Sequence, residues 1–184
     1  MVTGCRCFVQ FLGLALTLAA LGGVGFAVAT KWWYRDEFGL RVGLFSVTCE
    51  DGMMSALFCV PFKSRYEDHP WSKVLIAAEC GALLCGLVAL IWGIVTSTCT
   101  SPQSFPGTGG FNLLAGLLSI GGCAYFAYVF QNSFGDIIKS AEAHAQGEKQ
   151  GEGLGISFMI ACAGGVVFLI AAVIDFVAAC VKVE

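Results

Sequence analysis

Four long apolar runs set the strongest limit on what this chain can fold into. Over residues 8–29, 74–95, 111–130 and 154–174 they contain one charged residue, Glu79. Each run is long enough to cross about 30 Å of hydrocarbon at about 1.5 Å per helical residue. With 57% hydrophobic and 12% charged residues, the chain has too little polar surface for a soluble domain. The sequence predicts an all-α membrane protein, an antiparallel four-helix transmembrane bundle. The predicted spans are residues 8–30, 74–96, 111–130 and 154–180.

The segments between the spans are too short for a separate soluble domain, so residues 1–184 are expected to form one membrane domain. Both termini then lie on one side, and loops 31–73 and 131–153 lie on the other. The first run is too long for the apolar part of a signal peptide, which predicts a retained span. The uncharged link 96–110 is rich in Ser, Thr, Gly and Pro and predicts a flexible turn.

Loop 31–73 carries the pattern of a hairpin. Apolar residues alternate along 40–44, which predicts a half-buried strand, and 56–60 reads as the returning strand. Residues 50–52 (Glu-Asp-Gly) are a turn signal between them. A disulfide between Cys49 and Cys59 fits this hairpin, and closing so short a loop stabilises a fold by about 2–3 kcal/mol. The alternative is two free cysteines in a loop.

Loop 131–153 begins with an apolar helical face formed by Phe134, Ile137 and Ile138. This spacing predicts that the third helix continues past the membrane surface. The glycines between 147 and 153 are expected to end it before the fourth span.

The first loop resembles that of the claudin superfamily, which includes claudins, the peripheral myelin protein group and the gamma subunits of calcium channels and AMPA receptors. The shared pattern is Trp32 or Trp33 after the first span, then Gly43-Leu44-Phe45, then Cys49 and Cys59. The resemblance implies a small extracellular β-sheet built from both outer loops, with Cys49–Cys59 as its disulfide. It also implies that Trp32 or Trp33, together with Gly43-Leu44-Phe45, anchors the sheet on the bundle.

Three departures favour a divergent member of that group. Phe45 stands where the family has Trp, and three residues instead of two separate it from Cys49. The end of the chain, Lys182-Val183-Glu184, also differs from the tail by which junctional claudins bind PDZ domains.

Two signals oppose each other on orientation. Eight of the ten Lys and Arg residues lie in the two larger loops, which the positive-inside rule would place in the cytosol. The Cys49/Cys59 pair instead favours an oxidising compartment for these loops. Cysteines near the opposite boundaries are candidate cytosolic palmitoylation sites. These are Cys5, Cys7, Cys99 and Cys180. We therefore expect a plasma-membrane protein with loops 31–73 and 131–153 outside.

Two acidic residues fall within or at the end of a span. Glu79 lies about two turns into the second helix, where we expect water and loop residues to reach it, and Asp175 lies at the far end of the fourth. Because their depths are opposite, no proton-relay pair is expected. An interfacial or structural role is favoured for each, with ion handling or partner contact as the alternative.

Small residues four apart predict close helix packing, within this bundle or against a partner helix. The pairs include Ser119 with Cys123 and Ala161 with Gly165.

Other chemistry is not indicated by the sequence. The two histidines, His69 and His144, lack metal-ligand spacing, so no metal or cofactor is expected. No nucleophile motif or basic cluster indicates an enzyme or a nucleic-acid partner. The expected partners are membrane lipids and other membrane proteins, and the leading hypothesis is an accessory or structural subunit of a larger assembly such as an ion channel. The alternatives are a claudin-type junction protein that forms homo-oligomers, and a small transporter or channel.

Overall fold

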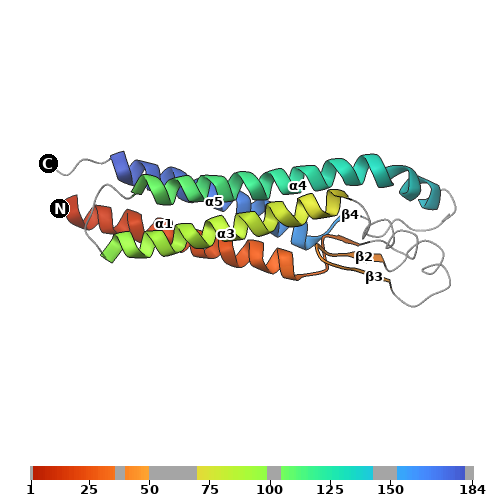
Figure 1. Cartoon of the computed structure of the whole chain (residues 1–184), viewed down its shortest axis with the longest axis horizontal. Helices are drawn as coiled ribbons and strands as arrows, with labels where there is room; N and C mark the ends of the chain where they lie inside the picture. The colour runs from red at the N-terminus through yellow and green to blue at the C-terminus, as the bar shows by residue number, and fades with distance from the viewer. Residues whose placement is uncertain (1, 36–39, 50–69, 99–104, 143–152, 181–184) are drawn as a thin grey trace.

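The computed structural model describes residues 2–35, 40–49, 70–98, 105–142 and 153–180. Four long helices lie side by side along the molecule (Figure 1). They are α1 (Val2–Ala29), α3 (Pro70–Thr98), α4 (Phe105–Glu142) and α5 (Ile156–Cys180). Each contains a stretch long and apolar enough to span a membrane, so the chain is an integral membrane protein. The predicted four-helix membrane bundle is confirmed.

The helices form a ring in which α1 packs on α3 and α5, and α4 packs on the same two neighbours. Close approach depends on glycine. A Cβ on Gly164 of α5 would lie 2.6 Å from a Val24 methyl carbon of α1, and one on Gly116 of α4 would lie 2.9 Å from the Gly165 carbonyl of α5. Because lipid is as apolar as the side chains, such close packing is a main source of helix association in a membrane.

Helix α4 begins earlier than the sequence pattern predicted. Residues 105–110 were expected to belong to a flexible link, but they form its first turns. The reason is packing: Gly109 lies against the Phe176 ring of α5, and Gly107 lies against Trp92 of α3. Glycine is a poor helix former in water, but here the missing side chains let α4 approach both neighbours.

At its other end α4 continues to Glu142, which confirms the predicted extension past the third span. It reaches beyond the other helices (Figure 1). At about 1.5 Å per residue, the 38 residues of α4 are about 57 Å long, well beyond the thickness of the hydrocarbon.

A small sheet lies against the end of the bundle where α1 stops and α5 starts (Figure 1). Its order is β3-β2-β1-β4, and every neighbouring pair is antiparallel. The strands are β1 (Tyr34–Arg35), β2 (Leu40–Val42), β3 (Val47–Cys49) and β4 (Gly153–Leu154). Tyr34 pairs with Val42 on one side and with Leu154 on the other. Both loops therefore contribute to one sheet, as the resemblance implied.

The hairpin turn differs from the predicted one. Strand β2 lies within the predicted strand 40–44, but its partner is β3, and the chain reverses where Gly43 N–H donates to the Ser46 carbonyl at 2.9 Å. The predicted turn at 50–52 and returning strand at 56–60 lie outside the described residues. Gly43 is required here because a Cβ would lie 2.9 Å from the Cα of Lys31.

Trp33 fixes the sheet to the bundle. Its side chain is buried, and its indole Nε1–H donates to the Ala27 carbonyl of α1 at 2.7 Å. The ring also makes edge contacts with Phe126 of α4 and Phe158 of α5, with centroids 5.4 and 6.2 Å away. One side chain thus joins three helices to the strand that follows it.

The anchor expected from the resemblance is only partly correct. Trp33, Gly43 and Leu44 are buried, whereas Trp32 is 50% exposed and Phe45 is 59% exposed. Trp32 contributes through its backbone instead, because its carbonyl accepts from Ser157 N–H in the first turn of α5.

We expect Trp33→Phe to lower the free energy of unfolding by about 1 kcal/mol, because a ring remains but its hydrogen bond is lost. Trp33→Ala should cost about 3–5 kcal/mol through the cavity it creates. Unfolding in mixed detergent micelles measures both. Trp32→Ala is the control and should change stability by less than about 0.5 kcal/mol. An equal loss for Trp32→Ala and Trp33→Ala would contradict this account of the anchor.

Candidate functional site

The inward face of α4 carries a row of polar side chains. Thr108, Asn112 and Ser119 are buried, and their spacings of four and seven residues place them on one side of the helix. Each of the two intramembrane carboxylates faces this row from a different helix. The row and its partners form two separate clusters, which we call the Glu79 cluster and the Asp175 cluster.

The Glu79 cluster joins α3, α4 and α5. The Ser119 hydroxyl lies 3.2 Å from Glu79 Oε2 and also 3.2 Å from the Ala161 carbonyl of α5. The Cys123 thiol donates to Glu79 Oε1 at 3.7 Å. Gly122 leaves room for this carboxyl group, since a Cβ there would lie 2.9 Å from Oε1.

Glu79 is completely buried, with 0% of its surface exposed. The expectation that water and loop residues reach it is therefore wrong. Its position along α3 was correctly placed near one end of the span, but the side chain points into the bundle, where α4 and α5 cover it. This burial agrees with the structural role that the sequence favoured.

The Asp175 cluster joins α5, α4 and α1. Asn112 donates from Nδ2 to Asp175 Oδ2 at 2.9 Å and to Thr17 Oγ1 at 3.0 Å. Thr17 in turn donates to the Gly13 carbonyl at 3.0 Å. Gly13 also lies against Asp175, because a Cβ there would be 2.6 Å from Oδ1. Asn112 thus connects two helices to a third across the bundle.

The two carboxylates do not meet. Glu79 contacts Ser119 and Asp175 contacts Asn112, and these two positions of α4 are about 10 Å apart along the helix axis. The expected absence of a proton-relay pair agrees with this geometry. Among the described residues, no group of three or more His, Cys, Asp or Glu side chains lies close enough to hold a metal ion.

Sequence reasoning singled out Glu79 and Asp175 but missed Asn112, Thr17 and Thr108. Asn112 was the available signal, because an amide inside an apolar run has to find partners within the protein. Thr108 Oγ1 is buried and has no hydrogen-bond partner in the part of the chain that the structure describes. The predicted small-residue packing is confirmed for Ser119, which bonds to the Ala161 carbonyl, and for Gly165, which packs against Ile120.

None of the other predicted site residues that the structure describes is bonded to either cluster. Cys49 is the last residue of β3, while Cys59 and the proposed pairing lie outside the described residues. Cys180 is exposed at the end of α5 and its thiol is free. Cys5 and Cys7 belong to the first turns of α1, and Cys99 lies outside the described residues.

No protein-family model matches this chain, and no curated protein matches it in sequence.

The Asp175 cluster predicts a graded response to substitution. We expect Asn112→Ala to destabilise the bundle by about 2 kcal/mol, because it removes two bonds and leaves a buried carboxyl without its donor. Thr17→Ala should cost about 0.6 kcal/mol, since Asn112 keeps its bond to Asp175. Unfolding in mixed micelles measures both values.

A double variant separates this coupling from simple loss of packing. If Asn112 and Asp175 act together, Asn112→Ala with Asp175→Ala should destabilise by less than the sum of the single changes. Strictly additive losses would mean that the hydrogen bond between them contributes nothing.

Proposed function

We propose that this chain is a non-enzymatic membrane protein that acts by protein–protein contact, as an accessory subunit of a larger membrane assembly. Both buried carboxylates are bonded to neighbouring helices inside the bundle, which leaves the outward helix faces and the sheet for interaction. The same observation makes transport through the bundle the weaker reading, because Asn112 and Ser119 of the polar row are used in links between helices.

The outward face of α4 is the observation that carries this proposal. Leu114, Leu117 and Gly121 are exposed there at helical spacing, with Gly110 one turn before them. A Cβ on Gly110 or Gly121 would meet nothing within 4 Å. Because glycine weakens a helix and none of the residues that the structure describes requires it at these two positions, they fit a neighbouring helix that approaches closely from outside.

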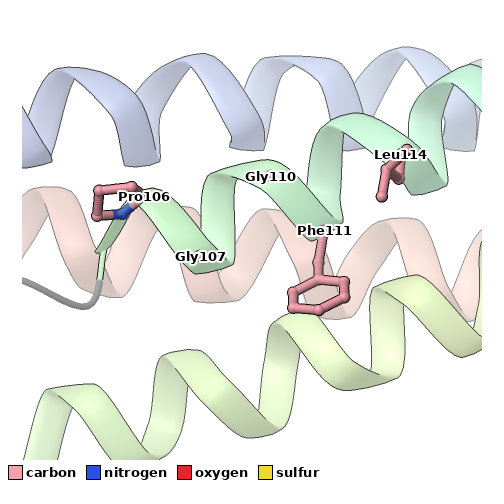
Figure 2. A pocket seen from close by; sticks show the side chains of 5 residues that line it. All are labelled: Pro106, Gly107, Gly110, Phe111 and Leu114. Atoms are coloured by element: carbon pink, nitrogen blue, oxygen red, sulfur yellow. The ribbon is translucent and has the colours of Figure 1, made fainter.

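A groove marks the start of this face. It is lined by Pro106, Gly107, Gly110, Phe111 and Leu114. Figure 2 shows that Phe111 extends from α4 toward α3, while Gly107 and Gly110 add no side chains between it and Pro106. A shallow apolar groove at a glycine-bearing face suits the side chains of a second transmembrane helix.

The resemblance to the claudin superfamily supports the same proposal and supplies an orientation. That resemblance implied a sheet built from both loops. The channel gamma subunits of the superfamily are the closest functional analogy. We place the sheet outside the plasma membrane, where Cys49 and Cys59 would be oxidised.

Adding a side chain at Gly121, on the outward face of α4, tests the proposal. The full chain is purified from its native membrane in mild detergent, and co-purifying proteins are quantified by mass spectrometry. We expect one larger membrane protein at fixed stoichiometry, and Gly121→Leu should reduce its recovery at least about tenfold, which corresponds to about 1.4 kcal/mol. Bundle stability should not fall, because the added side chain meets open space and leucine is a better helix former than glycine.

Gly22→Leu is the matched control, since Gly22 of α1 is also exposed and open to its surroundings. It should leave the partner bound. Recovery of homo-oligomers alone would contradict the accessory role and favour the junctional alternative. Loss of the partner with Gly22→Leu but not with Gly121→Leu would move the interface from α4 to α1.

A further inference from the structure

We propose that Glu79 is a proton-binding site: it carries a proton on Oε2 and, through Ser119, links α3 to α4 and α5 by a chain of hydrogen bonds that breaks when the proton leaves. This inference is independent of any partner. It rests on the hydrogen bonds that this part of the bundle can form.

The first step is the number of hydrogens on Ser119. Its hydroxyl has one hydrogen, but two oxygen atoms lie 3.2 Å away, Glu79 Oε2 and the Ala161 carbonyl. If Glu79 were ionised, these two acceptors would compete for that hydrogen. A proton on Oε2 resolves the competition, because Glu79 then donates to Ser119 and Ser119 donates to Ala161.

The second step concerns the other carboxyl oxygen. Glu79 Oε1 accepts a hydrogen bond from the Cys123 thiol at 3.7 Å. In a neutral acid with its proton on Oε2, Oε1 is the carbonyl oxygen and can still accept this bond. Gly122 lies directly against the same oxygen. In the protonated form each polar atom of the cluster therefore has a partner.

The third step is the missing counter-charge. Within the described ranges, the titratable groups near Glu79 are Cys123 of α4 and Cys162 of α5, and α1 contributes none. No lysine, arginine or histidine of these ranges forms an ion pair with Glu79, and the side chain is fully buried. Burying an unpaired carboxylate costs several kcal/mol, so the neutral acid is the stable form here.

Asp175 provides an internal contrast. Its Oδ2 accepts from Asn112 Nδ2, a group that only donates, so the bond requires no proton on that oxygen. Asp175 has 6% of its surface exposed, whereas Glu79 has none. Asp175→Asn is therefore a matched control for Glu79→Gln.

Infrared spectroscopy of the full chain in lipid bilayers at neutral pH reads the proton directly. We expect a carbonyl stretch of a protonated carboxylic acid that shifts in heavy water, is absent in Glu79→Gln and persists in Asp175→Asn. Ser119→Ala should move this band to higher frequency, because the acid loses its acceptor. If the wild-type spectrum differs from that of Glu79→Gln only by carboxylate bands, Glu79 is ionised and the proposal is overturned.

Thermal unfolding as a function of pH tests the link itself. If the folded state holds a proton that the unfolded state releases, the free energy of unfolding falls as the pH rises. An unfolded glutamate releases its proton above about pH 4.3, so the wild type should lose stability as the pH rises from about 5 through neutral. Glu79→Gln, whose amide N–H can donate to Ser119, should show no such loss. We expect the wild type to fall below it by at least about 2–4 °C. Parallel curves for the two proteins would reject the proton-dependent link.

Discussion

The inward face of α4 is the constraint on which the rest of this structure depends. Inside lipid there is no hydrophobic force to drive helices together, so association has to come from close packing and from hydrogen bonds between helices. Helix α4 bonds to all three of the others: to α3 through Glu79, to α5 through Asp175, and to α1 through Thr17. The last bond is notable because α1 lies diagonally opposite α4 in the ring, and the Asn112 side chain crosses the middle of the bundle to reach it.

The sheet depends on the same helices. Trp33 sits between Phe126 of α4 and Phe158 of α5, and Ser157 in the first turn of α5 is bonded to the Trp32 carbonyl. Phe126 follows Cys123 of the Glu79 cluster by less than one helical turn. A change in how α4 sits against α3 would therefore displace one wall of the site that holds Trp33. The sheet and the buried carboxyl group are coupled by a short, continuous set of contacts.

The sequence was sufficient to predict features set by length and composition. It was insufficient to predict which way individual side chains face. The apolar runs predicted four spans because each is as long as a helix must be to cross the hydrocarbon of a bilayer. The glycines at 107–110 looked like a turn because turn propensities describe chains in water, whereas here Gly107 and Gly109 are contact points for Trp92 and Phe176. The depth of Glu79 could be predicted, but its direction could not, because a helix that is apolar on all sides gives no periodic signal for its inner face.

The buried polar row also determines which surface α4 offers to its surroundings. Moving α4 by one residue would turn each of its side chains by about 100° and would separate Asn112 and Ser119 from their partners together. Two bonds at different depths therefore fix both the rotation and the height of this helix. Gly110, Leu114 and Gly121 lie about 160–200° around the helix from Asn112, so the bonds that hold α4 in place also hold the glycine-bearing face outward. In this bundle, the inner polar contacts and the outer contact surface are two consequences of one helix orientation.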